Sequence, residues 1–282
     1  MKKTGISLIA CVSFLSFISA CSNEKERNPD RSQPDEIVTY KTIGDTELTL
    51  HFFYPEKHKT FAKKPAIVFF FGGGWINGAP GQFFGQSRAL AELGMVAINA
   101  DYRVEKRHGT SPSECVKDGK SALRWVRKNA GNFGIDPNRI AAGGGSAGGH
   151  IAAATALVEG FNEEGEDISV DCRPNALVLF NPVFDNSAAG YGYDRVKKYW
   201  QEFSPMHNIK PGAPPTLVML GTQDKLIPVA TAEKYKALME SAGARCDLKL
   251  YEDQPHGFFN KIKYDETLAD TIEFLKSLGY IK

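Results

Sequence analysis

Residues 140–148 read Ile140-Ala141-Ala142-Gly143-Gly144-Gly145-Ser146-Ala147-Gly148, an apolar run that leads into glycines around a single serine. The pattern Gly-x-Ser-x-Gly falls between an expected strand over residues 140–142 and an expected small-residue helix over residues 147–157. Roughly one chain in five of this length contains the pattern by chance, so its position between strand and helix is the informative part. At such a junction the serine occupies a strained turn, and its hydroxyl group is raised above the sheet.

Strands and helices alternate on both sides of this stretch. Apolar runs predict buried strands over residues 66–71 and 95–100, and further strands are expected over residues 176–180, 216–220 and 246–251. Apolar residues at helical spacing predict helices over residues 86–94, 113–130, 229–242 and 265–278. Alternating residues around Gly44-Asp45 predict a hairpin of two further strands, residues 38–43 and 47–54. The expected fold is therefore α/β, with a mostly parallel eight-stranded sheet, helices on both faces and no large lid domain.

The composition fits one globular domain, expected over residues 36–282. Of the 282 residues, 42% are hydrophobic and 24% are charged, which is typical of a protein with a sizeable core. Lys and Arg total 34, against 33 for Asp and Glu. A nucleic-acid-binding protein needs a clustered basic excess, so we expect no nucleic-acid partner. The longest irregular stretch, residues 185–215, is a candidate binding rim.

The N-terminus has the features of a bacterial lipoprotein signal. Met1-Lys2-Lys3 precedes an apolar run that ends at Ala20 and is too short to span a membrane. Ile18-Ser19-Ala20-Cys21 resembles a lipobox, which predicts a signal peptide over residues 1–20 and lipidation of Cys21. The polar residues 21–35 are then a tether. We expect a cell-envelope lipoprotein, on the outer membrane or a periplasmic face; secretion or release into the periplasm is the alternative.

Three cysteines would remain in the folded domain after Cys11 and Cys21 are set aside: Cys115, Cys172 and Cys246. An oxidising compartment permits one disulfide among them, and the spacing defines no pairing. Because Cys246 opens an expected strand, we expect a buried thiol there.

A nucleophilic serine needs a base, and the base needs an orienting acid. His256 lies in a loop just past the expected strand 246–251, and Asp224 lies just past the expected strand 216–220. Functional residues gather at such positions in open α/β sheets. We therefore expect Ser146, Asp224 and His256 to be the catalytic nucleophile, acid and base. The reserve candidates are Asp185 and Asp253 as acids and His207 as base.

The other histidines predict no metal site. His51, in an expected strand, and His58, in a basic turn, are expected to be structural, and His150 is expected to be buried in the helix after the serine. The histidines are scattered without the paired spacing of metal ligands. We expect neither a metal nor a cofactor.

A run of glycines provides another expected part of the site. Phe71-Gly72-Gly73-Gly74-Trp75 follows the expected strand over residues 66–71. Glycines let the backbone approach a substrate oxygen closely. We expect the amides of Gly73, Gly74 and Ala147 to form an oxyanion hole, or a frame shifted by one residue to include Gly72.

Together these motifs resemble those of α/β-hydrolases of the bacterial esterase/lipase type, related to the hormone-sensitive-lipase-like carboxylesterases. The matching segments span residues 65–260 in the family's order: Gly72-Gly73-Gly74-Trp75, Asp101-Tyr102-Arg103, Gly134-Ile135-Asp136-Pro137-Asn138-Arg139-Ile140, the Ser146 turn, Asp224 and Pro255-His256-Gly257. The chain departs from the family at Phe71, where a histidine usually precedes the glycines, so packing of Phe71 must order the loop. The resemblance implies a serine esterase that acts by two-step acyl transfer.

Other functions fit parts of the same pattern. Gly143-x-Gly145-x-x-Gly148 also matches a dinucleotide-binding fingerprint, but residues 158–171 are polar where a second strand and its acidic residue should follow. A hydrolase-shaped binding module without activity would not require the serine, aspartate and histidine together. Peptidases of the same superfamily often carry a second gating domain, which we do not expect here.

The expected substrate is an ester on something bulky, because no long insertion predicts a lid and the N-terminus predicts an envelope anchor. Acetyl esters on carbohydrates come first and feruloyl esters second; a short-chain carboxylesterase of broad specificity is the alternative. The aromatic residues that could stack on a sugar or aryl ring are Trp75, Phe83, Tyr191, Tyr193 and Phe258.

Overall fold

The computed structural model describes residue 1 and residues 32–282. Apart from Met1, the predicted signal peptide, the predicted lipidation site Cys21 and most of the predicted tether lie outside the described residues. Among the helices of the described part of the chain, none is both long and apolar enough to cross a membrane.

Eight strands form one sheet in the order β1-β2-β4-β3-β5-β6-β7-β8. The pairs β1–β2 and β2–β4 are antiparallel, and every pair from β4 to β8 is parallel. This confirms the expected mostly parallel, eight-stranded sheet. The strands are β1 (Glu36–Ile43), β2 (Thr46–Phe53), β3 (Lys64–Phe70), β4 (Val96–Ala100), β5 (Ile135–Gly145), β6 (Ala176–Phe180), β7 (Thr216–Gly221) and β8 (Cys246–Tyr251).

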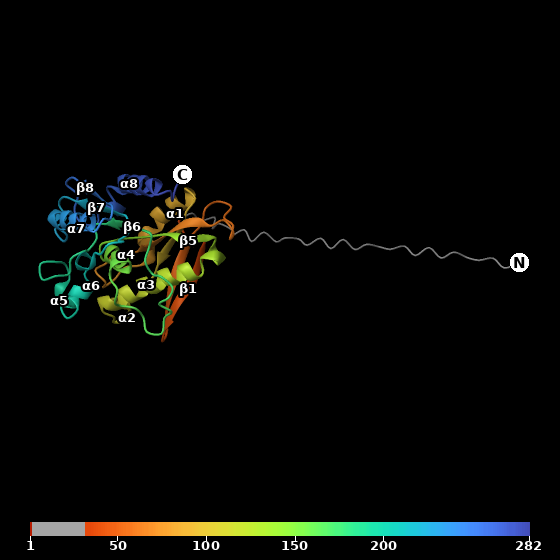
Figure 1. Cartoon of the computed structure of the whole chain (residues 1–282), viewed down its shortest axis with the longest axis horizontal. Helices are drawn as coiled ribbons and strands as arrows, with labels where there is room; N and C mark the ends of the chain where they lie inside the picture. The colour runs from red at the N-terminus through yellow and green to blue at the C-terminus, as the bar shows by residue number, and fades with distance from the viewer. Residues whose placement is uncertain (2–31) are drawn as a thin grey trace.

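Helices cover both faces of the sheet, as expected (Figure 1). One face packs against α1 (Phe84–Glu92) and α8 (Tyr264–Ser277), and the other against α3 (Pro112–Lys128), α4 (Ala147–Leu157) and α7 (Val229–Ser241). Neighbouring residues of β3 point to opposite faces, so Ile67 belongs to the core under α1 and α8, and Val68 to the core under α3 and α4. Burial on both faces explains why the central strands are continuously apolar.

Strand β5 is much longer than the expected residues 140–142. It begins at Ile135, which pairs with Lys64, and its register with β3 then shifts before Ile140 pairs with Ala66. The residues between form an irregularity closed by a hydrogen bond from the Asn138 amide to the Asp136 carboxylate, 3.0 Å. The Asp-Pro-Asn sequence therefore lies at an irregularity within the strand.

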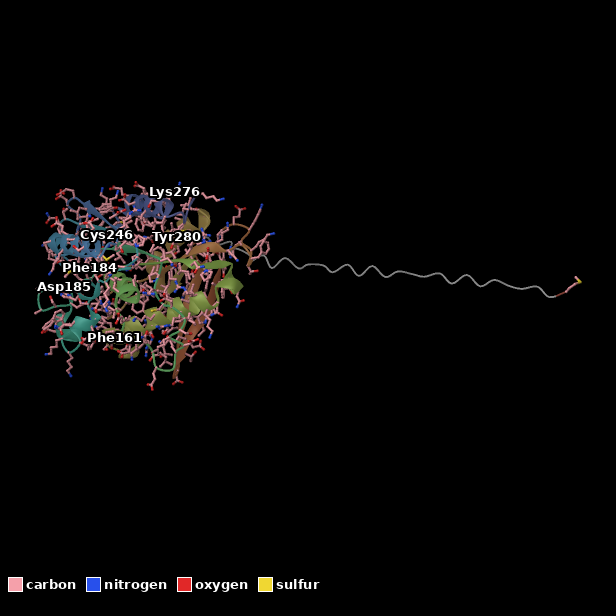
Figure 2. The ribbon with its side chains drawn as sticks, viewed as in Figure 1. Phe161, Phe184, Asp185, Cys246, Lys276 and Tyr280 are labelled. Atoms are coloured by element: carbon pink, nitrogen blue, oxygen red, sulfur yellow. The ribbon has the colours of Figure 1, made fainter. Side chains whose placement is uncertain are left out.

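The irregular stretch over residues 185–215 contains short helical turns. These are α5 (Tyr193–Val196), α6 (Trp200–Phe203) and the 3₁₀ turn η3 (Pro205–Asn208). Phe184 and Asp185, where the stretch begins, lie on the side of the molecule that carries α5 and α7 (Figure 2). The other short elements are α2 (Glu105–His108), η1 (Pro80–Phe83), η2 (Ala130–Phe133) and η4 (Phe258–Asn260).

The three cysteines of the described chain, Cys115, Cys172 and Cys246, are free and buried. The expectation of a buried thiol at Cys246 is confirmed, and Figure 2 labels its position in β8. Burial raises the pKa of this thiol to about 12, so it stays protonated at neutral pH.

Candidate active site

Ser146 occupies a tight turn between β5 and α4. Its φ of 53° lies in the left-handed region that residues with a side chain rarely adopt. The flanking glycines make the turn possible: a Cβ on Gly148 would lie 2.1 Å from the Phe70 carbonyl oxygen, and one on Gly144 would lie 2.5 Å from the Gly148 carbonyl carbon. The Gly-x-Ser-x-Gly spacing is therefore a steric requirement of this turn, which presents the serine above the carboxyl edge of the sheet.

A chain of hydrogen bonds joins Ser146, His256 and Asp224. The serine Oγ lies 2.9 Å from His256 Nε2, and His256 Nδ1 lies 2.7 Å from Asp224 Oδ2. Because the carboxylate can only accept, Nδ1 carries the proton and Nε2 is left to accept from the serine. The three residues come from turns after β5, β7 and β8, and parallel strands bring those turns to one edge.

The Asp224 side chain is buried and held by neutral donors. Its Oδ1 accepts hydrogen bonds from the backbone amides of Leu226, 2.8 Å, and Ile227, 2.9 Å, while Oδ2 faces the imidazole. These bonds satisfy the carboxylate without a cation. Its negative charge therefore remains available to stabilise a proton on the histidine.

The glycine loop after β3 presents unpaired amides near Ser146. The Gly72 N–H donates to Gln82 Oε1 at 2.6 Å, so this amide is already used and the shifted frame is disfavoured. Gly73 and Gly74 have φ values of 131° and 65°. Within residues 32–282, the N–H groups of Gly73, Gly74 and Ala147 have no hydrogen-bond acceptor. Such amides can receive a developing oxyanion.

Phe71 directly precedes the glycine loop, and its packing orders that loop. Its ring stacks on that of Tyr102 at a centroid distance of 4.0 Å. The Tyr102 hydroxyl donates to the Phe71 carbonyl oxygen at 2.6 Å. Tyr102 thus supports the loop through both the side chain and the backbone of Phe71.

A cleft of about 420 Å³ opens beside Ser146. Tyr191 and Phe259 line it together with the glycine loop, and so do several residues that the sequence analysis did not single out: Gln82, Asn181, Leu226, Asn260 and Lys261. Most of these follow β6, β7 or β8, so their position past the carboxyl ends of strands is a signal that could have identified them. The lining of the cleft is thus both polar and apolar: side-chain amides and one lysine lie beside the rings of Tyr191 and Phe259.

Of the aromatic residues expected to contact substrate, only Tyr191 lines this cleft. The expectation is wrong for Trp75 and Phe258, and likewise for Phe83, because all three are buried in the core. Trp75 packs edge-on against His150, and Phe258 packs against Tyr251. Tyr193 is half-buried against Trp200 and does not line the cleft.

The reserve candidates lie apart from Ser146. His207 Nδ1 is 2.9 Å from Ser204 Oγ and 3.9 Å from Asp185, so these residues form a separate polar group. Asp253 sits in the turn after β8 with a φ of 56°. The structure therefore joins Asp224 and His256, and none of the reserves, to Ser146.

The remaining histidines lie away from the cleft. His150 is fully buried in α4, and burial lowers its pKa to about 3, so it stays neutral. His58 is also buried and lies 2.9 Å from the Phe133 carbonyl oxygen. In the part of the chain that the structure describes, no three His, Cys, Asp or Glu side chains are grouped as metal ligands would be.

Comparisons with known proteins agree with this architecture. Residues 50–189 match the BD-FAE family, and residues 179–279 match the Prolyl oligopeptidase family. The structure of Thermogutta terrifontis esterase 2 phosphonylated by cyclosarin is 41% identical in sequence with a TM-score of 0.84, and the match covers 87% of this chain and 95% of that one. The propionate-bound form of that esterase is also similar, at 39% identity and a TM-score of 0.84, over 90% of this chain and 97% of that one.

Curated relatives are esterases as well. Esterase LipC of Mycobacterium tuberculosis is 29% identical over 212 residues, covering 68% of this chain and 52% of the relative. The acetylxylan esterase of Xylanibacter ruminicola is 29% identical over 266 residues, covering 88% of this chain and 52% of the relative. The chain thus spans about half the length of these curated relatives. By its sheet, its serine turn and its similarity to an esterase over nearly the whole of that protein, the chain belongs to the α/β-hydrolase superfamily, to its bacterial esterase/lipase type.

Proposed function

We propose that this protein is a serine carboxylic-ester hydrolase in which Ser146 is the nucleophile, His256 the general base and Asp224 the acid that orients the histidine. The observation that carries the proposal is the chain of short hydrogen bonds from Asp224 through His256 to Ser146, at the mouth of an open cleft. The hydrolytic activity of similar esterases supports it.

In the first half of the proposed reaction, Ser146 Oγ attacks the ester carbonyl carbon while His256 Nε2 takes the hydroxyl proton. The carbonyl oxygen becomes an oxyanion and accepts hydrogen bonds from the amides of Gly73, Gly74 and Ala147. The bond from carbon to the alcohol oxygen then breaks, and Nε2 returns its proton to the departing alcohol. An acyl group remains on Ser146.

In the second half, a water molecule attacks the acyl carbon and gives a proton to Nε2. The bond from carbon to Ser146 Oγ breaks, the serine recovers the proton, and the carboxylic acid leaves. Throughout, Asp224 accepts the Nδ1 hydrogen bond and stabilises the positive charge that forms on the imidazole. No step in this sequence requires a metal or a cofactor.

The proposed substrates are acetyl esters of carbohydrates, with feruloyl esters second. Two observations support this choice. The polar groups of Gln82, Asn181, Asn260 and Lys261 lie along a cleft that can receive a hydroxylated alcohol, and one of the relatives is an acetylxylan esterase. Among residues 32–282, no inserted segment forms a lid domain over this cleft.

A short-chain carboxylesterase of broad specificity is the second candidate. It is favoured by the propionate-bound and butyrate-bound structures of the Thermogutta esterase. The two candidates differ in the ratio of kcat/KM for acetylated xylan oligosaccharides to kcat/KM for aryl butyrate. A ratio above one supports the carbohydrate esterase, and a ratio well below one supports the second candidate.

The test of the proposed chemistry compares the purified protein with its Ser146→Ala variant on aryl acetate, butyrate and octanoate. We expect acetate turnover in the wild type and a loss of at least about 10⁴-fold in the variant. Ser241→Ala, a change on the exposed surface of α7, should keep full activity. Paraoxon, which phosphorylates the Thermogutta esterase, should label the peptide that contains Ser146. Folded wild-type protein that turns over none of the esters would contradict the proposal and favour a binding module.

We also propose that the mature protein is a cell-envelope lipoprotein anchored through Cys21, on the outer membrane or a periplasmic face. The support is the sequence Ile18-Ser19-Ala20-Cys21 after a basic and apolar leader. Labelled palmitate should be incorporated into the wild type in cells and not into Cys21→Ser. Equal labelling of both would reject the anchor, and secretion without lipid is the alternative.

A further inference from the structure

Asn181 follows β6 directly and adopts an unusual backbone conformation. Its φ is 34°, in the left-handed region, and none of the residue is exposed to solvent even though it borders the cleft. Left-handed conformations are strained for residues with a side chain, and asparagine tolerates them better than most. Such strain at a cleft points to a demand on the side chain.

The side-chain amide of Asn181 contacts the His256 loop with both of its ends. Its Oδ1 accepts a hydrogen bond from the Gly257 N–H at 3.2 Å. Because a backbone N–H can only donate, this bond fixes the orientation of the amide and turns the NH₂ group toward the imidazole. The Asn181 Nδ2 then lies 3.4 Å from His256 Nε2, the atom that also faces Ser146.

The turn that holds Asn181 also contacts the nucleophile. The Ser146 N–H donates to the Phe180 carbonyl oxygen at 2.9 Å, and the Val183 N–H donates to the Ser146 carbonyl oxygen at 3.2 Å. The Asn181 N–H donates to Met219 in β7 at 2.7 Å. One short turn thus fixes the backbone of Ser146 and the loop of His256 relative to each other.

We propose that Asn181 is a positioning residue for proton transfer at His256, an inference that rests on the proposed esterase function. Its carbonyl group holds the His256 loop in place. Its NH₂ group lies 3.4 Å from Nε2 and limits how far the imidazole can turn away from Ser146 Oγ. The amide thus keeps Nε2 in line for the proton transfers with Ser146, the departing alcohol and the entering water.

Two substitutions separate the roles of the two ends of the amide. Asn181→Gly keeps the positive φ without strain and removes both contacts, so we expect kcat to fall about 10- to 100-fold with KM within about twofold. Asn181→Asp keeps the acceptor for Gly257 and replaces the donor with a carboxylate. The charged or titratable groups that face His256 are Asp224 at Nδ1 and, along the cleft, Lys261. A second carboxylate at Nε2 stabilises the protonated imidazole, so the acid limb of the kcat/KM profile should move about one pH unit higher.

Asn175→Gly is the matched control, because Asn175 precedes β6 at the opposite edge of the sheet and its Oδ1 accepts from the Ile140 N–H at 3.0 Å. This variant loses a comparable bond and should keep kcat within about twofold. The inference is overturned if Asn181→Gly retains wild-type kcat, or if Asn181→Asp retains both wild-type kcat and the wild-type pH profile. Wild-type protein without esterase activity would reject the proposed function instead.

Discussion

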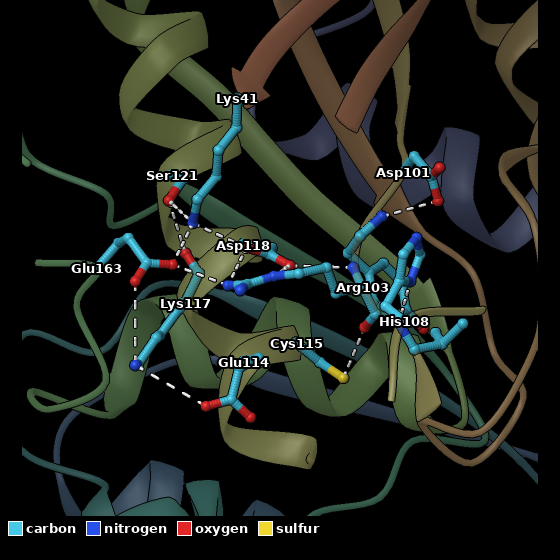
Figure 3. Close-up of polar contacts among 12 residues, drawn as sticks. Lys41, Asp101, Arg103, His108, Glu114, Cys115, Lys117, Asp118, Ser121 and Glu163 are labelled. Carbon is cyan, nitrogen blue, oxygen red and sulfur yellow. Dashed lines mark hydrogen bonds and ion pairs between the residues drawn. The ribbon is translucent and has the colours of Figure 1, made fainter. Parts of the chain in front are cut away.

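Asp224 at the cleft and Asp118 in α3 are both buried, and they hold their charges in different ways. Asp118 is fully buried and accepts hydrogen bonds from Lys41 Nζ at 2.7 Å and from Arg103 Nε and Nη2 at 2.8 Å (Figure 3). The Arg103 backbone N–H adds a fourth bond at 3.0 Å. Glu163 joins the same group through Lys41 and Arg103.

The two sites differ in the charge of the donors around the carboxylate. Asp118 is neutralised by two cations, whereas Asp224 receives two backbone amides and one imidazole. A carboxylate already paired with cations has little electrostatic effect to add elsewhere, while Asp224 can stabilise a charge that arises on His256. Burial alone therefore does not identify a candidate catalytic aspartate; the charge of the groups that donate hydrogen bonds to its carboxylate does. Four predictions test this comparison.

The largest effect is expected from Asp224→Asn. The amide no longer holds the imidazole in the useful tautomer or stabilises its charged form, so kcat should fall about 10⁴-fold. The free energy of unfolding should change by about 1 kcal/mol or less. Aryl acetate kinetics and urea denaturation measure the two quantities. Asp185→Asn, in the reserve acid, is the control and should keep kcat within about twofold; an equal loss in both variants would remove the distinction.

Asp118→Asn should have the opposite profile. It removes the buried counter-charge of Lys41 and Arg103 and leaves them only the partly exposed Glu163, which costs about 3 kcal/mol of unfolding free energy. The folded fraction should keep kcat within about threefold, because Asp118 does not touch the cleft. Urea denaturation and activity normalised to folded protein measure these effects. A large loss of kcat at unchanged stability would mean that the ion-pair group controls the active site.

A smaller effect, on the pH dependence of stability, is expected from His150 in α4, which is buried and makes no contact with Ser146 Oγ, unlike His256. The pKa of His150 is about 3 in the folded protein because of burial, against an ordinary value of about 6.5 in the unfolded chain. Between these values the unfolded state binds the extra proton. The free energy of unfolding contributed by this group is thus complete above pH 6.5 and falls by about 1.4 kcal/mol per unit as the pH drops.

Replacing the ring in His150→Gln should flatten the dependence of unfolding free energy on pH by that amount between pH 4 and 6.5. Urea denaturation at several pH values measures the slopes of both proteins. The comparison of slopes is independent of any constant loss caused by the substitution. Identical slopes would show that His150 does not remain neutral in the fold.

The smallest effect is expected at the edge of the ion-pair group. Lys117 lies 3.9 Å from Glu114 and 4.0 Å from Glu163, with all three side chains partly exposed (Figure 3). Lys117→Gln should therefore change the unfolding free energy by less than about 0.5 kcal/mol. A cost comparable to that of Asp118→Asn would show that the group acts as one unit extending to the surface.

Much of the fold could be predicted from local patterns. The continuous apolar runs predict the strands between residues 64 and 251, and the bounds of α4, β6 and β8 agree with the expected ranges to the residue. The extension of β5 back to Ile135 could not be predicted, because Asp136-Pro137-Asn138 has turn-forming residues and pairing with β3 overrides that preference. The local preference of the residues decides where a strand begins and ends only if pairing with a neighbouring strand does not override it.

Local patterns are enough to predict the mostly parallel sheet and the positions of Ser146, Asp224 and His256 past the ends of strands, because periodicity and glycine spacing are local properties. Three other features follow from the packed fold: which amide of the glycine loop Gln82 binds, that Trp75 and Phe258 pack inward, and that Asn181 reaches the histidine loop. Each of these depends on contacts between segments far apart in the chain. Burial, hydrogen-bond partners and the neutralisation of charge are set by such contacts, so the identity of a single residue does not predict them.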